Sequence, residues 1–145
     1  MKLKITIAVV ALLGLLDAIY LTIIKFSNNK ALCLEGVGDC WSVNNSRYSE
    51  WNGIPISIFG IIAYTIILLI LFFENKNKLL HNYGKILVIG ISISGFLMSI
   101  YLTYLQFAVI KAVCPFCIFS AMTMTTVFIL SLISYFKNQD DNILD

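Results

Sequence analysis

The chain has 145 residues, of which 59% are hydrophobic and only 12% are charged, and its mean hydropathy is +0.89. Soluble domains are about half apolar and about a quarter charged, so this composition indicates an integral membrane protein, and the length fits one domain. The net charge of +2 is small and no basic cluster is present, which argues against nucleic acid as a partner.

Four apolar segments are long enough to cross the hydrocarbon core of a bilayer, which takes about 20 helical residues. They cover residues 5–24, 54–73, 86–110 and 117–136. A signal peptide would end at a small-residue cleavage site, which is missing near residues 25–29, so the first segment is expected to be retained. We therefore expect an all-α integral membrane protein, a bundle of four transmembrane helices with a long outer loop between helices 1 and 2, forming a single domain over residues 1–145.

Local sequence sets the expected boundaries of these segments. Proline is tolerated in the first turn of a helix, so the second span is expected to include Pro55 and to begin at about Ile54. The polar residues 74–85 are expected to connect the second and third spans. The acidic tail, residues 137–145, is expected to have no fold of its own.

Counting four spans places both termini and the 74–85 connection on one side of the membrane, and the 25–53 loop and the 111–117 connection on the other. Six of the ten basic residues lie on the terminal side: Lys2, Lys4, Lys76, Lys78, Lys85 and Lys137. Basic residues favour the cytoplasmic side of a membrane. We therefore expect cytoplasmic termini and an outer face that carries the cysteines, where disulfides persist.

The four cysteines form two close pairs on that outer face. Cys33 and Cys40 lie in the first loop, and Cys114 and Cys117 form a CxxC motif that opens the fourth span. Such a motif can switch between dithiol and disulfide with little backbone movement. We expect all four to be catalytic, with the loop pair meeting a protein thiol and the CxxC pair meeting a lipid-soluble acceptor at the bilayer edge.

Other uses of four cysteines stay open. Zinc binds four thiolates, but the six residues between Cys33 and Cys40 exceed the usual ligand spacing, and we expect no metal. Two structural disulfides in a non-catalytic membrane scaffold are a further alternative, although a CxxC disulfide closes too small a loop to stabilise much. The only histidine, His81, lies on the opposite side, so a cysteine–histidine nucleophile is not expected.

Asp17 lies inside the first span, where a carboxylate costs several kcal/mol unless it is paired or hydrated. A functional role and a protonated, hydrogen-bonded structural role are both open. Around it, residues 14–22 match residues 95–103 at six of nine positions, at an offset of 81 that also carries Cys33 onto Cys114. Coincidence and an ancient duplication of a helical hairpin are the two interpretations, and the second and fourth spans show no such match.

A longer pattern resembles a known family. The runs CWSVNNSRY at residues 40–48 and GIPISIFG at residues 53–60, followed by Tyr64, are similar to the bacterial vitamin K epoxide reductase family, as are Cys33 and the CxxC motif. The resemblance covers nearly the whole chain. It implies a four-helix membrane bundle around a quinone, in the bacterial cytoplasmic (inner) membrane.

The resemblance also implies a mechanism. A thioredoxin-like partner would donate electrons to Cys33, Cys40 would pass them to Cys114, and Cys117 would face the quinone, so that disulfides are made in exported proteins at the expense of ubiquinone or menaquinone. Because this chain ends at Asp145, we expect the partner to be a separate protein on the outer side. An unrelated four-span family of disulfide-forming quinone reductases places its CxxC motif in the first outer loop, the reverse of the order here.

The expected quinone pocket combines the family motif with helical spacing. Ser46 matches a polar family position in the loop helix that covers the quinone, and the full set of candidates is Ser46, Ser57, Phe59, Met98, Tyr101 and Leu105. Vertebrate members have an asparagine early in the second span and a tyrosine one turn after the CxxC motif. Ile56 and Ala121 stand at these places here, so the resemblance implies quinone reduction rather than epoxide reduction.

Overall fold

The structure, a computed structural model, describes residues 2–27, 39–74, 76 and 78–143. In chain order its elements are α1 (Lys2–Ser27), α2 (Cys40–Asn44), the 3₁₀ helix η2 (Arg47–Ser49), β1 (Glu50–Trp51), β2 (Ile54–Pro55), α3 (Ile56–Phe73), α4 (Lys78–Leu105), the π-helical turn η3 (Gln106–Ile110) and α5 (Pro115–Ile143). Within the described residues, α1, α3, α4 continued by η3, and α5 are long and apolar enough to cross a membrane. The predicted all-α membrane fold with four transmembrane helices is confirmed.

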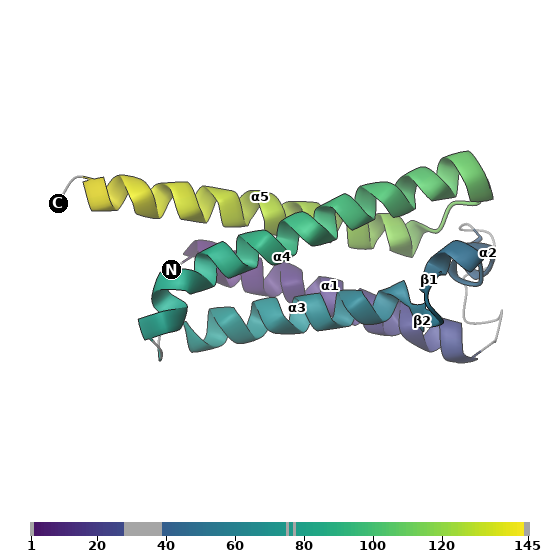
Figure 1. The fold of residues 1–145 in the computed structure, drawn as a ribbon, viewed down its shortest axis with the longest axis horizontal. Coiled ribbons are helices and arrows are strands. Elements are labelled where there is room, and N and C mark those ends of the chain that lie inside the picture. Colours follow the sequence, from purple (N-terminus) through teal and green to yellow (C-terminus); the bar gives the residue numbers. More distant parts are fainter. Residues whose placement is uncertain (1, 28–38, 75, 77, 144–145) are drawn as a thin grey trace.

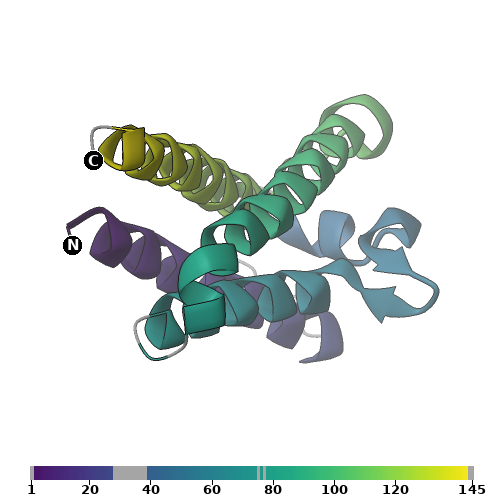
Figure 2. The same cartoon turned by 60° about the vertical axis from the view of Figure 1, so that its left-hand side comes forward.

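The four long helices form a bundle in which α1 and α4 each pack against both α3 and α5. Figure 1 shows the start of α1, the connection between α3 and α4, and the end of α5 at one end of the molecule. The short elements α2, β1 and β2 lie at the opposite end. In both Figure 1 and Figure 2, α3 and α4 diverge from their connection toward the end that carries α2.

Two apolar clusters hold the bundle together. The larger one includes Ile7 and Ala11 of α1, Tyr64 and Ile67 of α3, and Val127 of α5, all nearly inaccessible. A second cluster lies at the α2 end and is built around the described cysteines. Large apolar side chains also cover the outer surface of all four long helices. In water this would be a liability, but lipid tails solvate such side chains, and helix association then depends on close packing.

Glycines allow the closest of these contacts. A Cβ atom at Gly14 of α1 would clash with the ring of Tyr64 on α3, and one at Gly95 of α4 would lie 2.7 Å from the Cε of Met124 on α5. Small residues let neighbouring helices approach in this way. The two matching segments, residues 14–22 and 95–103, therefore each begin with a glycine at a close helix contact. In each case the contact is with the next long helix along the chain.

Two expected span boundaries differ from the structure. The second span begins at Ile56, because residues 54–55 pair with residues 50–51 in a hairpin. Its turn residues, Asn52 and Gly53, both have positive φ angles (56° and 84°), as a tight two-residue turn requires. The third span begins at Tyr83, three residues earlier than expected, and α4 itself starts at Lys78. The acidic tail adds no separate element, since α5 continues into it as far as Ile143.

Candidate active site

Cys40 is positioned by a short capped helix. It is the first residue of α2, and the Asp39 carboxylate accepts a hydrogen bond from the Ser42 N–H at 3.0 Å, which caps the helix. The Asp39 N–H in turn donates to the Val113 carbonyl at 3.0 Å. This main-chain bond joins the loop to the residue just before Cys114, so two segments far apart in the sequence are held side by side.

Lys25, in the last turn of α1, anchors the same loop from the other side. Its Nζ donates to the Asn44 carbonyl (2.8 Å) and to Ser49 Oγ (3.1 Å), and it forms an ion pair with Glu50 (2.7 Å). The Asn44 side-chain amide donates back to the Leu21 carbonyl at 2.8 Å. The Lys25 side chain is only 8% exposed, so these contacts are largely shielded from solvent and hold α2 against the end of α1.

The CxxC motif is positioned from α4. Lys111 adopts a left-handed conformation (φ 52°) and ends the π-helical turn, after which residues 112–114 lead into α5. The Cys114 N–H donates to Oε1 of Gln106 at 3.1 Å, and the Cys114 carbonyl accepts from the Ile118 N–H in the first turn of α5. Gln106 is buried, so its amide provides Cys114 with a polar partner in otherwise apolar surroundings.

These supports bring Cys40 and Cys114 into contact. The sulfurs of Cys114 and Cys40 lie 2.7 Å apart in hydrogen-bonding contact, and Cys40, Cys114 and Cys117 are all free thiols. Both contacting residues are buried in an apolar cluster with Leu21, Ile24 and Val43. The loop and the CxxC motif can therefore exchange a disulfide at this point without large backbone movement.

Burial and hydrogen bonding together favour the protonated thiols of this pair. Burial, followed by hydrogen bonding with Cys114, raises the pKa of Cys40 to about 12. Hydrogen bonding with Cys117, followed by burial, raises the pKa of Cys114 above its usual range. Since the thiolate is the attacking species, transfer through this pair requires a group that takes up the thiol proton.

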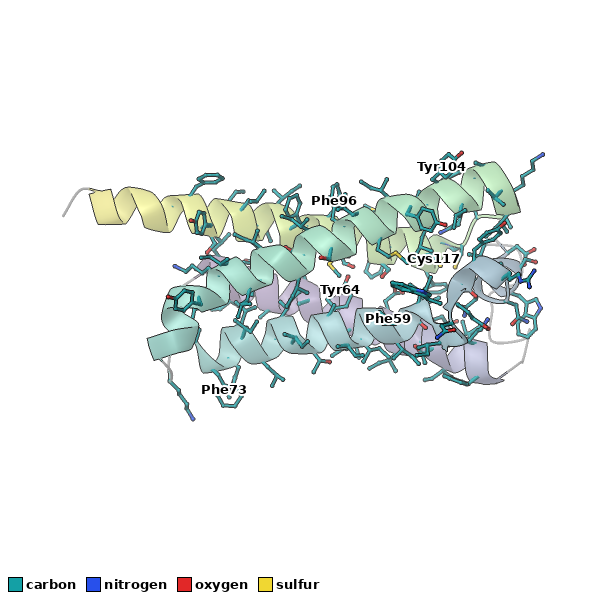
Figure 3. All side chains as sticks on the ribbon, in the orientation of Figure 1. Phe59, Tyr64, Phe73, Phe96, Tyr104 and Cys117 are labelled. Atoms are coloured by element: carbon teal, nitrogen blue, oxygen red, sulfur yellow. The ribbon has the colours of Figure 1, made fainter. Side chains whose placement is uncertain are left out.

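A cavity of about 580 Å³ lies beside the cysteines, between the four long helices and the α2–β1 loop. Its size falls within the range of small-molecule sites, and the exposed surface of its walls is mostly apolar, as in such sites, although several hydroxyl and amide side chains line it. Cys117 is on its wall, whereas Cys40 and Cys114 are not. Figure 3 shows Cys117 and Tyr64 pointing into the interior, while Tyr104 and Phe73 point outward.

Most candidates for the expected pocket line this cavity: Ser46, Ser57, Phe59, Met98 and Leu105. The structure does not bring Tyr101 to the cavity, since its side chain is 51% exposed on the outer face of α4. Ile56 and Ala121 also line the cavity, so apolar side chains occupy both positions singled out in the sequence. Cys33 lies outside the described residues.

Some residues of the site were not expected from the sequence. Asn44 and Gln106 are buried amides that hold α2 and the CxxC motif, and Lys25 was counted only as a loop charge. Gln106 carried a signal, as the one amide near the end of a long apolar span. Within the described residues, groups of three or more His, Cys, Asp or Glu side chains that could hold a metal ion are absent.

Asp17 lies deep in the bundle, beside this site. It is 8% exposed, its Oδ2 has no hydrogen-bond partner, and the Ser120 side chain of α5 is its hydrogen-bonding neighbour. Its charge also contributes to the raised pKa of Cys40. Neither of the two salt bridges among the described residues involves it.

Comparisons with known proteins agree with this geometry. "Thiol-disulfide oxidoreductase LTO1" of Arabidopsis thaliana is 27% identical to this chain over 123 residues, which are 81% of this chain and 33% of that protein. The chain thus spans about a third of the length of this relative. A sequence profile of the vitamin K epoxide reductase family matches residues 5–132, which reach all four membrane-spanning helices and include the CxxC motif. The family indicated by the motifs after Cys40 is confirmed, and the chain belongs to the vitamin K epoxide reductase family.

Proposed function

We propose that this protein is a membrane thiol-disulfide oxidoreductase that passes electrons from a thioredoxin-like dithiol to a quinone and so promotes disulfide formation in exported proteins. Electrons enter at Cys33, leave the loop at Cys40, and reach the quinone from the Cys114–Cys117 pair. The cysteine end of the bundle faces the outside of the bacterial cytoplasmic membrane, in keeping with the larger share of lysines at the other end.

The observation that carries the proposal is the 2.7 Å contact between the sulfurs of Cys40 and Cys114, with Cys117 on the wall of the adjoining cavity. One motif thus touches the loop through its first cysteine and the cavity through its second. A purely structural pair of disulfides would not need a thiol at the surface of an apolar cavity.

The reaction balances as two exchanges followed by one reduction. The partner dithiol becomes a disulfide as the loop disulfide is reduced, and the loop dithiol then reduces the Cys114–Cys117 disulfide by the same exchange. In the last step the Cys114–Cys117 dithiol is oxidised to a disulfide. The two electrons and two protons that it loses convert one quinone to one quinol.

The cavity fits a quinone ring better than a polar substrate. The exposed surface of its walls is mainly apolar, and Gly90 leaves open space along α4. Thr22 of α1 donates to Ser57 Oγ at 2.8 Å, which fixes one of the polar side chains on the wall. With Ile56 and Ala121 at the two positions that are polar in vertebrate members, we propose plain quinone reduction as the reaction.

The test is a two-substrate assay on the purified protein, with a reduced thioredoxin-like donor and a short-chain ubiquinone or menaquinone, followed by quinone absorbance. Donor-dependent reduction that is abolished by Cys117→Ala and by Cys33→Ala supports the relay. The Thr126→Val variant is a matched control, because this threonine lies exposed on α5 and bonds only within its own helix.

Two results would contradict the proposal. Quinone reduction that persists in Cys117→Ala would show that the relay does not end at this thiol. No turnover with any donor and quinone, together with bound metal in the purified protein, would favour a metal-binding or scaffold role for the cysteines.

A further inference from the structure

Four polar side chains gather in the membrane interior next to the cavity, and the relay of thiols uses none of them. They come from three helices: Asp17 of α1, Tyr64 of α3, and Ser120 and Thr123 of α5. Asp17 and Tyr64 are at least nine-tenths buried, with exposures of 8% and 1%. Polar groups at this depth are costly unless each finds a partner, so a gathering of this kind is a candidate functional site.

The hydroxyl groups of Tyr64 and Thr123 are both hydrogen-bonded within this cluster. The Thr123 hydroxyl donates to the Ser120 carbonyl at 2.8 Å, and the Tyr64 hydroxyl lies 2.9 Å from Thr123 Oγ1 and 3.4 Å from the same carbonyl oxygen. Gly14 has no side chain, which leaves room for the Tyr64 ring against α1. Tyr64 is therefore fixed from both sides, and its proton is already committed to a neighbour.

Asp17 differs from the rest of the cluster because its bonding is incomplete. The Ser120 side chain is its hydrogen-bonding neighbour, but Oδ2 has no partner although it is buried. A carboxyl group with one oxygen unoccupied can take up a proton there without breaking a bond already made. Ser120 also lines the cavity, one helical turn after Cys117 and on the same face of α5.

We propose that Asp17 is the proton-carrying group of the site, taking up a proton lost by the CxxC dithiol and returning it through the Ser120 hydroxyl to the acceptor in the cavity. This inference rests on the proposed function. The dithiol loses two electrons and two protons, the quinone gains both, and Asp17 ends the cycle as it began it. The role suits the cysteines, because the raised pKa values of Cys40 and Cys114 call for a group that accepts a thiol proton.

The other titratable groups that face Asp17 are few. Tyr64 faces it from α3 and Cys40 from α2, and both are influenced by its charge. The α5 side contributes the Ser120 hydroxyl. Among the side chains named here Asp17 is the only carboxyl group. The effect of replacing it on quinone reduction can therefore be distinguished from the effect of replacing a cysteine.

The test compares Asp17→Asn with Asp17→Glu in the purified full-length protein. Asparagine keeps the shape but carries no exchangeable acid proton, so quinone reduction should fall about 100-fold, as expected for loss of a positioned acid–base group. Thiol exchange between the donor and the loop pair, measured without quinone, should change by far less, because the charge of Asp17 is only the smallest of the causes that set the pKa of Cys40. Glutamate should restore part of the rate, and the pH dependence of quinone reduction should flatten only in the asparagine variant.

Ser131→Ala is the matched control, since it removes another buried oxygen without a partner, at the far end of the bundle beside Lys4 and Glu74. Its rate and pH profile should equal those of the wild type. If Asp17→Asn does not fold, time-resolved infrared spectra of the wild type and Asp17→Glu replace it. A protonated carboxyl band that rises and decays during quinone reduction, and shifts in the glutamate variant, supports the proposal, and a band that stays constant throughout turnover overturns it.

The outcomes separate the two proposals. An active wild type together with an Asp17→Asn variant of equal rate and equal pH profile overturns the role of Asp17 and leaves the relay intact. A wild type that never reduces quinone overturns both.

Discussion

The contact between Cys40 and Cys114 can be tested as a trapped disulfide. A variant with Cys33→Ala and Cys117→Ala keeps only these two thiols, whose sulfurs lie 2.7 Å apart. Mild oxidation should link them almost completely, and mass spectrometry of the linked peptides should identify the bond. The matched control, Cys33→Ala with Cys114→Ala, keeps Cys40 and Cys117 and should link much more slowly, because Cys117 faces the cavity.

The trapped bond should also stabilise the protein by a calculable amount. It joins residues separated by 74 positions in the sequence, and the chain entropy lost by closing a loop of that length corresponds to about 4 kcal/mol. A disulfide within the CxxC motif closes a loop of a few residues and would contribute only about 2 kcal/mol by the same relation. For a chain of this size, about 4 kcal/mol corresponds to a rise of roughly 10 °C in the unfolding temperature.

The assay is thermal unfolding in detergent, with and without reductant. The oxidised double variant should unfold at the higher temperature, and reductant should remove the difference. If the two thiols stay reduced under oxidant, or the linked protein gains no stability, the contact does not represent the folded protein and the relay loses its central step.

Three further predictions follow from the same geometry. Gly14→Ala places a methyl group against a buried aromatic ring and should lower the unfolding free energy by about 1–3 kcal/mol, whereas Gly90→Ala, with open space around it, should not; equal effects would contradict the packing. Gln106→Leu leaves the buried Cys114 N–H without its acceptor, which should cost about 1–3 kcal/mol in unfolding free energy and slow disulfide trapping at that thiol. Because the pKa of Cys40 is raised to about 12, its alkylation rate in the folded protein should keep rising with pH above 9, whereas in the unfolded protein it should level off there; a plateau near pH 9 in the folded protein would contradict its burial.

The four transmembrane helices could be predicted because a hydrophobic segment of about 20 residues that crosses a bilayer must adopt a helical conformation. Backbone polar groups have no water partners in hydrocarbon, so each apolar segment must be helical. The errors lie at the ends of the segments, where that constraint disappears. Residues 54–55 were assigned to a helix by hydropathy, yet the Asn52–Gly53 turn pairs them in a hairpin.

The cavity could be predicted only in part, because helical spacing fixes relative angles and not the direction that a helix faces. Met98 and Leu105 lie within about 20° of each other around α4 and both line the cavity. Tyr101 lies about 60° away from Met98 in the direction opposite to Leu102, which also lines it, and so falls outside the arc. Only the packing of α4 on α5 decides where that arc points.

The sequence by itself determined the number of spans, the grouping of the cysteine motifs at one end of the bundle, and the family. These follow from hydropathy, from counting, and from short motifs, all of which are local properties of the chain. Only the tertiary structure decided that Cys40 meets Cys114 while Cys117 faces the cavity, and that Asp17 has Ser120 as its hydrogen-bonding neighbour and one buried oxygen without a partner. Such pairings depend on how helices rotate and approach one another, which is set by side-chain packing between segments distant in the sequence.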